Sequence, residues 1–103
     1  MDGDDPKLGR KFDQEKPRYD LIPWECMDDV ALVLTKGAEK YAPDNWKYVK
    51  GARWRYVGAA FRHLVARARG EMNDKETGLP HVSHAICCLL FLGWFDKHQE
   101  VED

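Results

Sequence analysis

The stretch ARWRYVGAAFRHLVARARGEMNDKETGLPHVSH, residues 52–84, indicates two helices joined by a polar loop. Apolar side chains recur at helical spacing in its first half, which predicts an amphipathic helix over 52–69. Gly70 is a natural stop just after that helix, and Pro80 suits the first turn of a new one. The short connection predicts that the two helices are antiparallel neighbours. The apolar stripe of the first helix consists of Trp54, Val57, Phe61, Leu64, Val65 and Ala68.

Two further apolar patterns predict an all-α fold. After Pro23, one stripe at helical spacing consists of Trp24, Met27, Ala31, Leu34, Ala38 and Tyr41. The last helix is apolar on nearly every side between residues 85 and 95, and such a helix is buried all round. We therefore predict an antiparallel helical bundle of three main helices, near 23–41, 52–69 and 80–98. Its completion requires oligomerisation through the last helix, to a homodimer or homotetramer.

Composition restricts the classes of protein that fit. The 103 residues suit one domain, with mobile ends at 1–14 and 99–103. A net charge of −2 without a long basic run argues against a dedicated nucleic-acid binder. Three cysteines, two of them adjacent, do not form a disulfide framework, and no charged-then-apolar leader opens the chain, so we expect a cytoplasmic protein. The apolar run over 85–95 is about half of the ~20 residues that span a membrane.

The polar loop and its flanks concentrate possible metal ligands. Imidazoles and carboxylates bind zinc and manganese, and carboxylates also bind magnesium. His63 lies about 10 Å before the end of its helix, at a rise of 1.5 Å per residue. His81 and His84 share one face of the next helix, so the rings and the loop carboxylates can converge. The candidate ligands are His63, Glu71, Asp74, His81 and His84. The alternative is a solvated loop between helices that carry structural histidines.

Cations and aromatic residues elsewhere suit a phosphorylated, planar ligand. Lys16 and Arg18 are closely spaced cations, and Arg62 lies beside His63. In the turn after the first helix, the residues Tyr41, Asn45 and Trp46 can stack on and hydrogen-bond a base. The alternatives are that the cations are ordinary surface charges and that the aromatic rings cover the edge of the core.

Several short motifs in this order resemble one known family. They are KPRYDLIP (16–23), GAEKY (37–41), NW (45–46), RH (62–63) and GExxDxETGLPHxxHA (70–85). Together they resemble the phage dATP/dGTP diphosphohydrolase family, a MazG-like group of all-α nucleoside triphosphate pyrophosphatases that includes the MazZ proteins. The match spans about Phe12 to Phe95. It implies one MazG-like domain over residues 1–103. This oligomeric enzyme would hydrolyse a purine deoxynucleoside triphosphate to the monophosphate and pyrophosphate.

The resemblance also implies roles for individual residues. The cofactor would be Mg²⁺ or Mn²⁺, with two or more ions per site. Glu71 and Glu76 are the catalytic candidates, with Glu76 as a general base or as a hydrogen-bond partner of a ligand. The phosphates would be held by Lys16, Arg18, Lys40 and Arg62. The base or sugar would be contacted by Tyr41, Asn45 and Trp46.

The chain departs from the pattern of typical MazG-like enzymes. Those enzymes hold metal with an E-E-x-x-E helix that faces an E-x-x-D helix, and this chain has no E-E-x-x-E. Its E-x-x-D beside the site, Glu71 to Asp74, falls in the predicted loop. His81 and His84 stand where the second helical pair is expected, so the choice of ligands stays open. Other classes also stay open: a non-catalytic helical metal-binding or regulatory module, and a nucleic-acid-associated protein that uses the arginines of residues 52–69.

Overall fold

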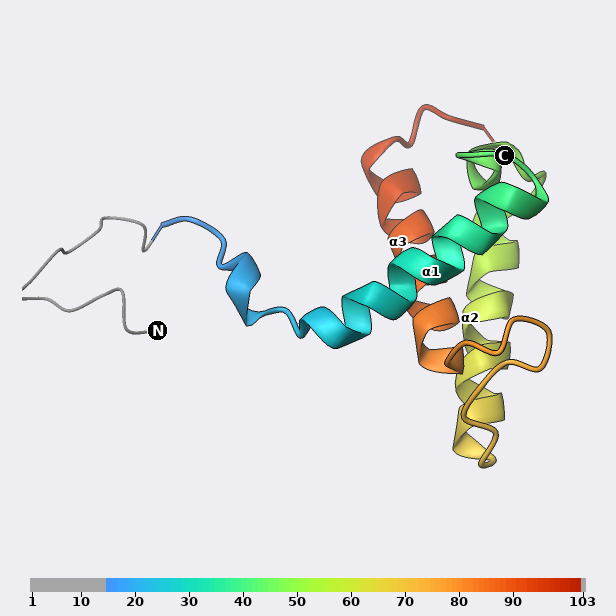
Figure 1. Ribbon diagram of the computed structural model, residues 1–103. Helices are drawn as coiled ribbons and strands as arrows, with labels where there is room; N and C mark the ends of the chain where they lie inside the picture. The colour runs from blue at the N-terminus through green and yellow to red at the C-terminus, as the bar shows by residue number, and fades with distance from the viewer. Residues whose placement is uncertain (1–14, 103) are drawn as a thin grey trace, which may run out of the picture.

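Three helices make up most of the computed structural model, which describes residues 15–102 (Figure 1). The elements in chain order are η2 (Tyr19–Leu21), α1 (Trp24–Lys40), η3 (Asn45–Tyr48), α2 (Ala52–Ala68) and α3 (His81–Lys97). No strand occurs within residues 15–102, where Asn73 and Pro80 form an isolated bridge. The prediction of an all-α fold is confirmed, and each predicted helix boundary lies within one residue of the observed one.

The two later helices form an antiparallel pair, and α1 crosses them (Figure 1). α3 packs most extensively on α2 and also contacts α1. The loop between α2 and α3, drawn in yellow to orange, lies at one end of this pair. The segment 15–22 extends from the start of α1 away from the other two helices. This arrangement brings the end of α2, the loop and the start of α3 together.

The core is small and is centred on α3. Its buried apolar residues are Val30, Ala52, Ala60, Ala85, Cys87, Cys88 and Phe95. The ring of Trp46 stacks on Phe91 with 4.5 Å between centroids and meets Trp94 and Phe95 edge-on. The hydroxyl of Tyr56 donates to the carbonyl of Trp46 at 3.0 Å. Through these contacts η3 is fixed against both α2 and α3.

The apolar stripe predicted for α2 does not face the core of the chain. Trp54 is 82% exposed and Phe61 is 63% exposed, whereas Ala52 and Ala60 are buried. The face of α2 that contacts α3 carries Tyr56, whose ring meets Phe91, and His63, which lies against His81. The stripe predicted for α1 is displaced in the same way, because Trp24 is exposed and Val30 is buried. Periodicity identifies an apolar face but does not say what covers it.

The structure describes the C-terminal segment of the chain but not residues 1–14. Residues 1–14, expected to be mobile, lie outside the described residues. After α3, the carbonyl of Val101 accepts a hydrogen bond from Arg53 at 2.9 Å, so the segment after His98 is held against α2. Within a single chain, α3 is not buried all round, since Leu89 and Leu90 are half exposed. In the described part of the chain, every helix is too short or too polar to cross a bilayer.

Candidate functional site

The loop between α2 and α3 is a closed, hydrogen-bonded turn. Gly70 and Gly78 adopt φ angles of 100° and 74°, which favour glycine, where the chain leaves α2 and turns back. The N–H of Asp74 donates to the carbonyl of Leu79 at 2.8 Å. The N–H of His81 donates to the carbonyl of Met72 at 2.9 Å, which fixes the start of α3 to the loop. The predicted polar loop is therefore a defined structure that holds its side chains in place.

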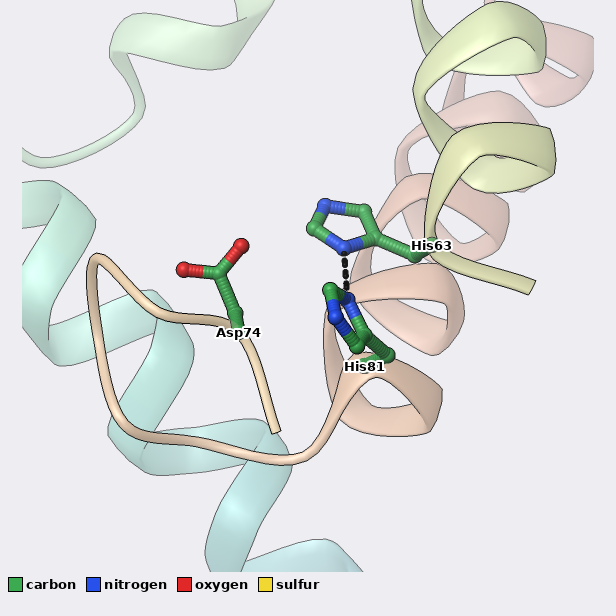
Figure 2. Close-up of side chains that lie close together, drawn as sticks. All are labelled: His63, Asp74 and His81. Carbon is green, nitrogen blue, oxygen red and sulfur yellow. Dashed lines mark hydrogen bonds between the residues drawn. The ribbon is translucent and has the colours of Figure 1, made fainter. Parts of the chain in front are cut away.

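Three of the predicted metal ligands converge at this end of the molecule (Figure 2). His63 comes from α2, Asp74 from the loop and His81 from the first turn of α3. The Nδ1 atoms of His63 and His81 are 2.8 Å apart, and one potential ligand atom from each of the three residues lies within 4.8 Å of the others. Two donors on one ion, at bonds of about 2.1 Å, are separated by roughly 3–4 Å. The cluster therefore offers two nitrogens and one oxygen to a single cation.

Backbone amides hold the carboxylate of Asp74. Its Oδ1 accepts hydrogen bonds from the N–H of Glu76 at 2.8 Å and the N–H of Thr77 at 3.0 Å. Burial works against the charged carboxylate, but these two amides, together with the nearby rings of His84 and His63, keep the pKa of Asp74 below its ordinary value. Asp74 is therefore ionised at neutral pH, the state in which a carboxylate binds a cation.

The other two predicted ligands contact this cluster from outside it. Glu71 Oε2 lies 2.9 Å from Nε2 of His81, on the side of the ring opposite to His63. The ring of His84 stacks on that of His63, with 4.6 Å between centroids and 10° between planes. Nε2 of His84 lies 2.7 Å from the hydroxyl of Thr77. Thus His63, Asp74 and His81 come together, whereas Glu71 contacts the ring of His81 and His84 stacks on that of His63.

Burial favours the neutral form of the two stacked rings, His63 and His84. Desolvation is the main cause that lowers the pKa of His63, and the nearby rings of His84 and His81 lower it further. Desolvation also lowers the pKa of His84, against the charge of Asp74, which raises it. Since only a neutral imidazole has a free nitrogen lone pair, this electrostatic environment favours metal binding at neutral pH.

A cleft of about 850 Å³ opens beside the cluster. It lies between α1, the segment around η3, α2 and α3, and both His63 and His84 form part of its wall. Of the predicted substrate-binding residues, its wall includes Tyr41, Asn45, Trp46 and Arg62. The structure thus brings all three expected base contacts, and one of the four expected phosphate contacts, to the same space as the histidines.

Comparison with known proteins identifies the family of the chain. A model of the family described as "dATP/dGTP diphosphohydrolase, N-terminal" matches residues 6–103. The chain belongs to this family. It is also 36% identical over 95 residues to a dATP/dGTP diphosphohydrolase of Salmonella phage PMBT28, a match that covers 92% of this chain and 32% of the relative. The chain therefore spans about a third of the length of that relative. No solved structure matches.

The region matched by the family contains every residue of the cluster and the cleft. The resemblance drawn from the short motifs is confirmed at the level of the family. The loop that carries Glu71 and Asp74 is also the E-x-x-D segment placed in a loop by sequence, and it is a loop in the structure. Metal in this chain would thus be held between a helix, a loop and a helix start, rather than between two acidic helices.

Other predicted site residues lie apart from the cluster. Lys16 and Arg18 belong to the segment that extends away from the helices, and the two oxygens of Asp20 accept bonds from Arg18 at 2.7 and 3.3 Å. Within one chain neither cation reaches the cleft. Lys40 forms an ion pair of 3.0 Å with Glu76 beside the loop. Their roles toward substrate remain predictions.

Trp46 has a structural role as well as its place on the cleft wall. One face of its ring is covered by Phe91, and its edges meet two further aromatic rings. Tyr41, in contrast, is 63% exposed at the end of α1 and lines the cleft, with Nζ of Lys40 over its ring. Of the two aromatic residues predicted to contact a base, Tyr41 is the more accessible.

Sequence reasoning missed three residues of the site. Arg55 and Tyr56 line the cleft on the same helix as Arg62. The separation of seven residues between Arg55 and Arg62 is two helical turns, and this spacing was the available signal. Thr77 contacts both Asp74 and His84, and nothing in the sequence except its place in the loop motif pointed to it.

Proposed function

We propose that this chain hydrolyses a purine deoxynucleoside triphosphate of the dGTP or dATP type to the monophosphate and pyrophosphate, with a divalent metal. The observation that supports this most is the cluster of His63, Asp74 and His81 at the end of a cleft with cationic and aromatic walls. The family to which the chain belongs and the printed name of its phage relative support the same substrate class.

The donor set fits a transition-metal ion better than magnesium. Two imidazole nitrogens and one carboxylate oxygen suit manganese or a similar ion, whereas magnesium prefers oxygen ligands alone. Glu71 supports this assignment, because a carboxylate on the second ring nitrogen of His81 orients the ring and makes it more basic. Within residues 15–102 one group of three such residues is present, which fits one ion per chain.

The positions of the residues suggest a role for each in hydrolysis. His63, Asp74 and His81 would hold a divalent cation, which would neutralise triphosphate charge and acidify water. Attack by water on the α-phosphorus forms a new P–O bond and breaks the bond to the β-phosphate oxygen, so pyrophosphate leaves. Arg62 and Arg55 offset negative charge along the α2 wall. Glu76, exposed on the loop beside Lys40, is the proposed acceptor of the proton from water.

The opposite wall of the cleft would hold the nucleoside. Tyr41 offers an exposed ring for stacking, and Asn45 offers both a donor and an acceptor for base or sugar. Lys40 lies next to Tyr41, with its Nζ 5.2 Å from the centre of that ring, and would meet the phosphates from α1. Lys16 and Arg18 would contribute phosphate contacts only from a neighbouring copy or after a movement of their segment.

We also propose that the chain acts as a homodimer or homotetramer. α2 and α3 leave large apolar side chains exposed, which are Trp54, Phe61, Leu64, Val65, Leu89 and Leu90. Monomeric proteins rarely expose so many on two adjacent helices. The three cysteines are free thiols, which fits an enzyme of the reducing cytoplasm.

A product assay tests the activity. The protein is incubated separately with dATP, dGTP, dCTP and dTTP, first with Mn²⁺ and then with Mg²⁺, and the products are separated by anion-exchange chromatography. We expect purine monophosphate and pyrophosphate, with turnover lost in His63→Ala. Asp28→Asn is the matched control, because Asp28 is exposed on α1 outside the cleft. Orthophosphate as the first product, or turnover of pyrimidines alone, contradicts the proposal.

The same preparation tests the alternative of a non-catalytic module. The relevant observation is the exposed apolar face of α2 and α3, which also suits a binding protein. Binding of Mn²⁺ without turnover of any nucleotide would favour that reading.

A further inference from the structure

Thr77 links the loop to the stacked rings of His63 and His84. Among the described residues, its hydroxyl forms the only side-chain hydrogen bond between the loop and these two rings. Its hydroxyl oxygen accepts the N–H of Leu79 at 3.2 Å. The same oxygen is 2.7 Å from Nε2 of His84 and 3.4 Å from Oδ1 of Asp74. Its own backbone N–H donates to that carboxylate oxygen at 3.0 Å. Thr77 therefore contacts the predicted ligand Asp74 and the ring of His84, which stacks on His63.

The hydroxyl has one hydrogen to donate, which leaves two possible arrangements. It donates to Nε2 of His84, or it accepts from that nitrogen and donates to Asp74. In both arrangements the short contact fixes the ring of His84. That ring stacks on His63 at 10° between planes, so its position limits the tilt of the His63 ring. Thr77 thus acts on Asp74 directly and on His63 through His84.

We propose that Thr77 is a positioning residue of the metal site, which sets the carboxylate of Asp74 and the ring of His63 at the angles that a cation needs. This inference rests on the proposed function, since it assumes that the cluster binds metal. Thr77 contacts two side chains around the ion and need not touch the ion. Partners of this kind typically contribute about 10–100-fold to metal affinity or activity.

The test measures the binding of Mn²⁺ to the full chain, without nucleotide, by titration calorimetry. Thr77→Val removes the hydroxyl at almost constant volume, and Thr77→Ser keeps the hydroxyl. We expect the Kd for Mn²⁺ to rise about 10–100-fold in Thr77→Val and to stay near that of the unchanged protein in Thr77→Ser. Thr35→Val is the matched control, because the hydroxyl of Thr35 donates to the carbonyl of Ala31 on exposed α1 and lies outside the cleft.

A second readout separates positioning from loss of structure. A positioning role lowers turnover at limiting Mn²⁺ and lets saturating Mn²⁺ restore much of it. A structural role lowers turnover equally at every Mn²⁺ concentration, because the folded fraction falls. Circular dichroism is recorded for each variant, and Thr77→Ala repeats the test without a branched side chain. If both variants that lack the hydroxyl unfold, the positioning role is overturned in favour of a structural one.

The failure of this inference differs from failure of the proposed function. If the unchanged protein binds no Mn²⁺ and turns over no nucleotide, the proposed function is wrong and the inference falls with it. If the unchanged protein binds Mn²⁺ and Thr77→Val binds it equally well, Thr77 does not position the ligands, while the proposed function stands.

Discussion

Replacing Asp74 by asparagine and by alanine separates the contribution of its hydrogen bonds from that of its negative charge. The carboxylate holds two backbone amides through Oδ1, and its charge serves the proposed cation. Asn keeps an oxygen acceptor at the same place and removes the charge. Ala removes both. We expect both variants to lose Mn²⁺ affinity by more than the ~10–100-fold that is typical of partners behind a ligand.

The stability of the two variants should differ. Hydrogen bonds to a charged group contribute about 1.5–3 kcal/mol each. The amide of Glu76 belongs to an exposed residue, so water replaces part of that bond, and we expect a loss of roughly 1–2 kcal/mol for Asp74→Ala. That corresponds to a fall in Tm of about 4–8 °C for each kcal/mol. Asp74→Asn should lose less stability than Asp74→Ala, because its amide oxygen still accepts the two bonds, without the charge.

Calorimetric titration with Mn²⁺ and thermal unfolding of the metal-free protein measure the two effects independently. Asp28→Asn serves as the control for loss of an exposed carboxylate. Full Mn²⁺ affinity in Asp74→Asn would mean that the carboxylate serves only the loop. An unchanged Tm in Asp74→Ala would mean that the two amides do not depend on it.

Three further predictions concern the core, the histidines and the apolar face. Phe95→Ala should lower the free energy of unfolding by about 3–5 kcal/mol, since Phe95 is fully buried, and urea denaturation with Tyr48→Ala (81% exposed) as control measures this. Burial lowers the pKa of His63, so the unfolded chain takes up protons first as pH falls. Stability of the metal-free protein should therefore be constant above about pH 6.5 and decline below it, with a weaker decline in His63→Phe when Tm is followed against pH. Leu90→Glu should dissociate the oligomer but keep the helices, and light scattering that shows a wild-type monomer at micromolar concentration would contradict the proposed assembly.

Helix positions followed from the sequence because local signals specify them. Gly70 and Pro80 delimit the loop, and the spacing of apolar residues located α2 to within one residue at its end. Which face of each helix is buried did not follow. Trp54 and Phe61 satisfy the helical period but are exposed, because α2 meets α3 through the face that carries Tyr56 and His63. Packing between helices depends on shape, which periodicity does not contain.

The sequence predicted which residues gather at the candidate site, but it did not predict which of them contact one another. Histidines and carboxylates close in sequence indicated a metal site, and three of five candidates converge. The roles of Glu71 and His84 depend on which side of a ring they meet, and that depends on the path of the loop. The contacts of Thr77 arise from the same path. Spacing along a chain gives the set of side chains that can meet, and backbone geometry selects among them.

The hydrogen bond between His63 and His81 has a consequence for how the site changes from empty to filled. Glu71 next to Nε2 of His81 favours a hydrogen on that nitrogen, so Nδ1 of a neutral His81 is an acceptor and the hydrogen between the two rings belongs to His63. If His63 and His81 held a cation through these nitrogens, His63 would carry its hydrogen on Nε2 instead, which is a change of tautomer. Nitrogen-15 chemical shifts distinguish the two tautomers, so the capture of a cation should be visible as an exchange of tautomers at a single ring.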